Sequence, residues 1–213
     1  CSWDSVIPFA PMWAAIKHVL KPRGVFVTTA SQPFTSALVM SNPKWFKYAW
    51  VWNKRSPSDP LNVKRRPMKQ HEDLCVFSEN GHTYNPQFRD ETAKRFGKAS
   101  QPKTTVYGAR GDKQAEGVGY PLSILVFGRP NNLSGGGNHP TQKPVALYEY
   151  LIRTYTNEGE TVLDMTAGSG TTGVAAINTG RNVILIEQRE DYADIARARC
   201  EKAAEQARQL ELI

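Results

Sequence analysis

Cysteine is scarce in this sequence and long hydrophobic runs are missing, and both features narrow the class of protein. Three cysteines occur among 213 residues, at Cys1, Cys75 and Cys200. They form neither an even set nor a Cys-x-x-Cys pair, which excludes a secreted disulfide scaffold and makes a reducing cytoplasm the expected compartment. No apolar run approaches the roughly 18 residues that span a bilayer, and no signal-peptide pattern opens the chain. A membrane partner is therefore not expected.

Histidine is also sparse. The four histidines, His18, His71, His82 and His139, are scattered without the spacing of metal ligands, so no metal site is predicted. Hydrophobic residues make up 40% of the chain and charged residues 22%. This balance is typical of a globular protein that buries a core. The length fits one domain, residues 1–213, with an insertion.

Positive charge is concentrated in the middle of the chain. The formal net charge is +7, and residues 44–113 hold 15 Lys+Arg against 7 Asp+Glu, so the rest of the chain is nearly neutral. The cations of this block alternate with aromatic residues, as on surfaces that neutralise phosphates and stack on bases. The alternative is that Tyr48, Trp50 and Trp52 share one face of a core strand.

We interpret these aromatics as mostly core and the basic loop, residues 53–69, as functional. Pro57, Pro60 and Pro67 are expected to keep the loop out of regular structure. Six cations of this loop are candidate phosphate contacts: Lys54, Arg55, Lys64, Arg65, Arg66 and Lys69.

Helical and strand patterns alternate through much of the chain, which predicts an α/β fold. The first predicted helix follows Pro8 and Pro11 and ends at residue 20. The other predicted helices cover residues 33–40, 144–156 and 171–178, and a long one begins at about residue 191. The predicted strands cover residues 24–29, 46–52, 74–77, 161–164 and 182–187. Residues 80–138 lack such patterns apart from a short apolar stretch at 124–127, and we interpret them as a binding insertion or a poorly ordered segment.

A glycine-rich turn at residues 164–173 is the most informative segment. The preceding strand ends in Asp164, the chain turns through Gly168 and Gly170, and a helix opens at Thr171. The glycines let a ligand lie against the main chain, and the helix N-terminus offers unpaired N–H donors. The next strand ends in Glu187, whose carboxylate could accept the two hydroxyls of a ribose. A nucleoside fits such a site.

The spacing formally matches the G-x-G-x-x-G fingerprint of nicotinamide dinucleotide sites. However, Asp164 lies four residues before Gly168, where its charge would oppose a pyrophosphate but suit a cationic ligand such as S-adenosylmethionine. A P-loop is excluded because no Gly-Lys-Ser/Thr follows. An ordinary tight turn remains the structural alternative.

Just upstream, His-Pro-Thr-Gln-Lys-Pro at residues 139–144 is either a helix start or a segment whose Lys143, with Thr141 and Gln142, reaches the cofactor's carboxylate.

Three stretches together resemble the amino-group DNA methyltransferases, which modify adenine N6 or cytosine N4, most closely their phage and prophage members. These stretches are residues 139–144, residues 164–172 and Ser-Gln-Pro-Phe-Thr-Ser at 31–36. The resemblance covers nearly the whole chain and implies the permuted order of that family, with a target-recognition insertion at approximately residues 80–138. It implies a Rossmann-like methyltransferase fold with a mostly parallel twisted sheet and helices on both faces. It also implies action on double-stranded DNA in the cytoplasm of a bacterial or phage-infected cell, with a homodimer left open.

The family's Asp-Pro-Pro-Tyr tetrapeptide, which binds the target amine, is absent from the sequence. The nearest matches, at residues 58–61 and 85–88, lack the second proline. Because residues 1–4 resemble the residues shortly after the tetrapeptide in these enzymes, the catalytic residues and their strand are expected upstream of Cys1, and the parallel sheet is expected to have a gap. No catalytic residue is therefore assigned.

The resemblance assigns cofactor roles to eleven residues: Thr141, Gln142, Lys143, Asp164, Ala167, Gly168, Ser169, Gly170, Thr171, Thr172 and Glu187. The leading hypothesis is an S-adenosylmethionine-dependent adenine-N6 methyltransferase, of the kind found in restriction-modification systems. Three rivals stay open: a cytosine-N4 methyltransferase, a non-catalytic DNA-binding remnant and a nicotinamide-dependent enzyme.

Overall fold

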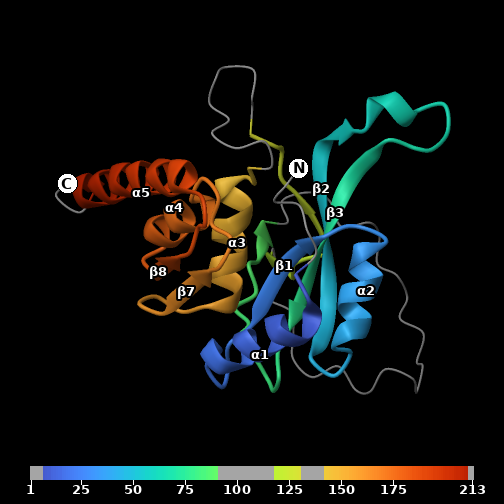
Figure 1. The fold of residues 1–213 in the computed structure, drawn as a ribbon. Helices are drawn as coiled ribbons and strands as arrows, with labels where there is room; N and C mark the ends of the chain where they lie inside the picture. Colours follow the sequence, from blue (N-terminus) through green and yellow to red (C-terminus); the bar gives the residue numbers. More distant parts are fainter. Residues whose placement is uncertain (1–6, 91–117, 131–141, 211–213) are drawn as a thin grey trace. The chain divides into compact units, whose positions relative to one another are not determined.

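The computed structural model describes residues 7–90, 118–130 and 142–210 (Figure 1). The chain divides into two compact units, one formed by Cys1–Asn85 with Ser123–Ile213 and the other by Pro86–Leu122. In the smaller unit, β4 (Arg89–Asp90) pairs antiparallel with β5 (Val118–Gly119). All remaining helices and strands of the described residues belong to the larger unit.

The larger unit contains a four-stranded sheet. Its order is β1 (Phe26–Ala30), β3 (Lys69–Phe77), β2 (Phe46–Ser58) and β6 (Ile124–Val126). Strand β3 is antiparallel to both β1 and β2, whereas β2 and β6 are parallel. The sheet is thus mixed, and the prediction of a mostly parallel sheet is wrong for this part. The reason is that β2 and β3 follow one another through a hairpin, which forces the second strand to return antiparallel.

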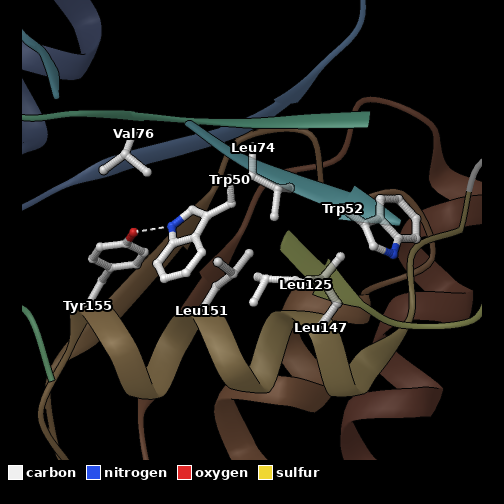
Figure 2. Close-up of a cluster of buried hydrophobic side chains, with 8 residues drawn as sticks. All are labelled: Trp50, Trp52, Leu74, Val76, Leu125, Leu147, Leu151 and Tyr155. Atoms are coloured by element: carbon white, nitrogen blue, oxygen red, sulfur yellow. Dashed lines mark hydrogen bonds between the residues drawn. The ribbon is translucent and has the colours of Figure 1, made fainter. Parts of the chain in front are cut away.

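Helices cover both faces of this sheet, as predicted. Along β3, Leu74 and Val76 point to one face while Cys75 and Phe77 point to the other, and all four are fully buried. Helix α3 (Val145–Tyr155) packs against the first face (Figure 2). Helices α1 (Phe9–Val19) and α2 (Phe34–Ser41) contribute to the cluster on the second.

The aromatic residues of β2 belong mainly to the core. Trp50 and Trp52 are 4% and 1% exposed and lie with Leu147 and Leu151 of α3 in one cluster (Figure 2). The indole N–H of Trp50 donates to the hydroxyl of Tyr155 at 2.6 Å, so its polar atom keeps a partner inside the core. Burial raises the pKa of the Tyr155 hydroxyl, which stays protonated. The interpretation of these residues as mostly core is confirmed.

A second, two-stranded sheet lies toward the C-terminus. Strands β7 (Thr161–Asp164) and β8 (Asn182–Leu185) are parallel and are connected by α4 (Thr171–Asn178). Ile152 of α3 packs with Ala175 and Ala176 of α4, so α3 contributes to the cores of both sheets. Helix α5 (Glu190–Leu210) completes the unit.

In the described part of the chain, both sheets end in strands that pair on one side only. Among the described residues, β1 pairs only with β3 and β7 pairs only with β8. Alternation along β7 and β8 leaves apolar side chains on the face away from α4, with Leu163, Ile184 and Ile186 exposed at 39%, 54% and 52%. None of the helices in the described segments is both long and apolar enough to cross a membrane.

The basic loop is more regular than predicted. Strand β2 continues to Ser58 and β3 already begins at Lys69, so the two strands extend into a β-hairpin arm. The register shifts between Asn53 and Ser58, which accommodates Pro57 where no ladder donor is needed. A short 3-10 helix, η1 (Pro60–Asn62), lies beyond the strands. The prolines therefore shape the arm without abolishing its strands.

Candidate functional site

Two carboxylates hold the ends of the glycine-rich turn. Asp164, at the end of β7, accepts a hydrogen bond from the backbone N–H of Thr166 at 3.0 Å and another from the hydroxyl of Thr172. Glu187, just after β8, accepts from the N–H of Gly168 at 2.7 Å. Parallel pairing of β7 and β8 brings both carboxylates to the same edge of the small sheet.

The turn itself needs glycine. Gly168 and Gly170 have φ of 50° and 77°, in the left-handed region that other residues enter at a cost. Helix α5 passes close to the turn, so a Cβ added at Gly170 would lie 2.7 Å from the Cβ of Ala196. The tight turn therefore depends both on backbone freedom and on the small side chain opposite it.

Most of the predicted cofactor residues come together here. Ser169, Thr171 and Thr172 are almost completely buried, and the Ser169 hydroxyl donates to Gln142 Oε1 at 3.5 Å. Ala167 is buried, and its N–H donates to the carbonyl of Ile186 at 3.0 Å, which connects the turn to the residue that follows β8. Thr141 lies outside the described residues.

Lys143 lies beside this group but contacts the hairpin arm. Its ammonium donates to Glu72 Oε2 at 2.7 Å and lies 5.3 Å from the ring centre of Trp52. In this arrangement its charge is already paired. A role at the carboxylate of a bound cofactor would require Lys143 to exchange or share its partner.

Lys54 is the second cation on Glu72. Its ammonium lies 3.3 Å from Glu72 Oε1, and the side chain is only 5% exposed. The predicted phosphate contact by Lys54 is therefore wrong for this conformation. The physical reason is the two-residue period of a strand, which places Lys54 on the same inward face as Trp50 and Trp52.

Glu72 is charged in spite of its burial. Burial alone would raise its pKa, but the charges and hydrogen bonds of Lys143 and Lys54 together outweigh that effect and hold the pKa of Glu72 below its ordinary value. The three side chains form a charged triad between β2, β3 and the segment that precedes α3. Glu72 was missed from the sequence because its two partners are 18 and 71 residues away.

The other cations of the basic loop lie on the hairpin arm. Four of them are exposed and Lys69 is half-buried; the exposed ones are Arg55, Lys64, Arg65 and Arg66. The guanidinium of Arg66 pairs with Asp59 on the same arm. The arm thus offers a cationic surface with Lys64 and Arg65 at its end.

Arg199 of α5 is a residue of the site that the sequence patterns did not indicate. Its guanidinium donates to the carbonyl oxygen of Ser169 and, at 3.0 Å, to the Ser169 hydroxyl. Together with Ala196 and Cys200 it forms one face of α5, at spacings of three and four residues. Ala196 and Cys200, four residues apart on an otherwise very polar helix, are the sequence signal that marks this face of α5.

The residues present fit a nucleoside ligand that carries positive charge. Two carboxylates at the strand ends suit positive charge, a turn in the left-handed region allows close backbone approach, and the N–H donors at the N-terminus of α4 suit a negatively charged group of the same ligand. No cluster of three or more metal-ligating side chains occurs in the part of the chain that the structure describes.

Comparison with known proteins identifies the family. The family model for N6/N4 methyltransferases, described as DNA methylase, matches residues 6–198. The chain belongs to this DNA methylase family. It is 49% identical over 209 residues to the type II methyltransferase M2.DpnII of Streptococcus pneumoniae, covering 93% of this chain and 71% of the relative. It is 41% identical to M2.MboI of Moraxella bovis, covering 92% and 68%.

Solved structures show the same fold. The chain matches the complex of the methyltransferase M1.HpyAVI with S-adenosylmethionine at a TM-score of 0.62 and 25% identity, covering 91% of this chain and 84% of that one. It matches the cytosine-N4-specific PvuII DNA methyltransferase at a TM-score of 0.64, covering 94% and 76%, and at 18% identity this likeness concerns the fold alone. The methyltransferase fold expected from the sequence is confirmed.

Arg199 gives a first test of the site in this DNA methylase. Replacing Arg199 with alanine removes two charged hydrogen bonds from Ser169, so the affinity for S-adenosylhomocysteine in calorimetry should fall about tenfold or more. Arg199→Lys, which keeps the charge and one donor, should lose less. Arg197→Ala is the matched control because Arg197 is 67% exposed and, among the described residues, pairs only with Asp194 of the same helix. If Arg199→Ala and wild type bound S-adenosylhomocysteine with equal affinity, Arg199 would have no part in supporting the ligand site through Ser169.

Proposed function

We propose that the glycine-rich turn is the cofactor site of this enzyme and that the enzyme methylates adenine N6. The chain is an S-adenosylmethionine-dependent DNA methyltransferase that acts on an exocyclic amine, as its family and relatives show. The observation that carries the site is the pair of carboxylates, Asp164 and Glu187, which hold the two ends of the turn.

Each group of the site has a proposed role. Glu187 would accept the ribose hydroxyls, Asp164 and residues 167–172 would hold the methionyl part and adjoin the adenosine, and Gln142 and Lys143 would contact the carboxylate, together with Thr141. The bound cofactor supplies a methyl group on a positively charged sulfur. Asp164 favours that charge by its own negative charge, and the half-buried turn keeps this interaction from being fully screened by water.

The target amine needs help from the protein because its lone pair is delocalised into the ring. A base acted on by such an enzyme is taken out of the stack into a pocket, where acceptors polarise the amine and hold it in line with the methyl group. The described residues of this chain do not include the family's Asp-Pro-Pro-Tyr tetrapeptide.

We propose that the amine-binding residues are carried by a strand outside the described residues. Support comes from the edges of β1 and β7, each of which pairs with one neighbour only among the described residues. A strand that paired with both edges would join the two sheets and place its end beside Asp164. We propose that this strand carries the Asp-Pro-Pro-Tyr tetrapeptide that the resemblance implies.

The experiment that tests the function is label transfer. The protein extended upstream through the expected strand is incubated with methyl-tritiated S-adenosylmethionine and unmethylated duplex DNA, and the DNA is digested to nucleosides. Label in N6-methyladenosine supports the proposal. Label in N4-methylcytosine would identify the cytosine alternative, and no transfer by the extended protein would favour a non-catalytic remnant.

We further propose that the hairpin arm binds duplex DNA through its exposed cations. Support comes from the exposure of Lys64 and Arg65 at the end of the arm.

The proposed compartment is the cytoplasm, in keeping with the free thiols of Cys75 and Cys200. Sedimentation velocity at micromolar concentration would decide between a monomer and a homodimer.

Charge reversal tests the DNA contact. The variant Lys64→Glu with Arg65→Glu should lower DNA affinity and reduce the slope of log affinity against log salt by about 2, because each phosphate contact contributes about 1. Arg66 is left intact because it pairs with Asp59. Arg197→Glu, which changes an exposed charge on α5, serves as the control. If the slope of log affinity against log salt were unchanged in the double variant, Lys64 and Arg65 would be ordinary solvated surface residues that do not contact DNA.

A further inference from the structure

The end of the hairpin arm exposes apolar side chains among its cations. This arm tip, defined as residues 59–68, carries Leu61 at 96% exposure, Val63 at 51% and Met68 at 47%. Single exposed leucines are common on protein surfaces. Here, however, three exposed apolar side chains lie within eight positions on a projecting element and form a group. Leu61 is the most exposed of the large hydrophobic side chains in the described residues.

The arm tip is held in a defined conformation. Asn62 donates through its side-chain amide to Asp59 Oδ1 at 2.6 Å, and its carbonyl accepts from the N–H groups of Arg65 and Arg66 at 2.8 and 3.0 Å. Arg66 also pairs with Asp59. Leu61 lies in η1 within this hydrogen-bonded turn. Its exposure is therefore a property of an ordered turn.

The root of the arm is attached to the cofactor site. Lys54 and Glu72, on the two strands of the arm, pair with each other, and Glu72 pairs with Lys143. The neighbouring Gln142 accepts a hydrogen bond from Ser169 in the glycine-rich turn. A short chain of contacts thus links the arm, which extends beyond the four-stranded sheet in Figure 1, to the turn.

We propose that Leu61 is a wedge that inserts between base steps of duplex DNA while Lys64 and Arg65 contact the flanking phosphates. An apolar side chain projecting among cations matches the way that proteins unstack and kink DNA, and an enzyme that withdraws a base from the stack leaves an apolar space for such a side chain. A second copy of the chain fits less well, because two arm tips of net positive charge repel each other. The proposal rests on the DNA contact of the arm proposed under the function.

Unwinding of closed-circular DNA tests the wedge without knowledge of the target sequence. A relaxed plasmid is resealed by topoisomerase in the presence of the protein, and the change in linking number is read on a gel after the protein is removed. Wild type should lower the linking number, and Leu61→Ser should reduce this change about fivefold or more at equal DNA occupancy. Leu61→Phe should retain it. Met40→Ser, which alters a side chain 71% exposed on α2, is the matched control.

The outcomes separate the wedge from the DNA contact. An unwinding change in Leu61→Ser equal to that of wild type, at the same occupancy, would overturn the wedge, as would a wild type that binds DNA without unwinding it. Dimers of wild type that dissociate in Leu61→Ser, seen by sedimentation velocity, would assign the arm tip to a second copy instead. An unchanged salt slope in the Lys64→Glu, Arg65→Glu variant would show that the underlying DNA contact itself has failed, and the wedge with it.

Discussion

Replacement of Gly170 with alanine is expected to weaken S-adenosylhomocysteine binding about 30-fold and to destabilise the fold by about 2–4 kcal/mol. The φ of 77° at this position costs an alanine about 1–2 kcal/mol. In addition, the new methyl group would lie 2.7 Å from the Cβ and 2.8 Å from the Cα of Ala196. Neither atom is the end of a flexible side chain, so the turn or α5 must move.

Gly159 supplies the control for the backbone part of this effect. Its φ is 76°, and no atom lies within 4 Å of an added Cβ. Gly159→Ala should therefore lose only the backbone cost of about 1–2 kcal/mol of unfolding free energy, measured in urea, and keep its affinity for S-adenosylhomocysteine. If Gly170→Ala lost no more stability and no more affinity than Gly159→Ala, the close packing of α5 on the turn would have no role in ligand binding.

Replacement of Glu72 with glutamine should lower the unfolding free energy by about 3 kcal/mol, since removing one member of a buried ion group leaves the others unpaired. Glu72 is 18% exposed and Lys54 is 5% exposed, so water can rescue little of the lost interaction. The melting temperature should fall by about 10 °C for a chain of this size. Glu79→Gln is the control, because Glu79 is 45% exposed in its pair with Lys17 and should change stability by less than about 1 kcal/mol.

The same triad predicts a pH dependence. The folded-state pKa of Glu72 lies below its ordinary value of 4.5, so the carboxylate stabilises the fold fully above about that pH and loses this contribution as pH falls through the folded-state pKa. The stability difference between wild type and Glu72→Gln should hence be constant near neutrality and shrink below about pH 4.5. A difference that stayed constant into this acidic range would contradict the ionised triad.

The parts of the fold and site with strong local signals could be predicted from the sequence. The bounds of α4 and β7 agree with the predicted residues 171–178 and 161–164, because a strand that ends in a carboxylate, two glycines and a helix start lie within one short segment. The same local pattern brought Asp164 and Glu187 to one edge, since parallel strands joined by one helix end on the same side.

Features set by distant partners were harder to predict. The pairing of Lys143 with Glu72 joins residues 71 positions apart, and no local pattern marks such a pair. The length of the hairpin arm was not predicted because Pro57, Pro60 and Pro67 interrupt the strand pattern, although β2 continues to Ser58 and β3 begins at Lys69. The burial of Lys54, in contrast, was within reach, since it follows Trp50 and Trp52 at the period of a strand.

The most direct test of the proposed cofactor site is a calorimetric titration of this chain with S-adenosylhomocysteine and, separately, with NAD. The carboxylate-bound glycine turn predicts one S-adenosylhomocysteine site per chain with micromolar affinity, lost in Asp164→Ala, and no measurable NAD binding. Tight NAD binding with no heat from S-adenosylhomocysteine would contradict the proposed site.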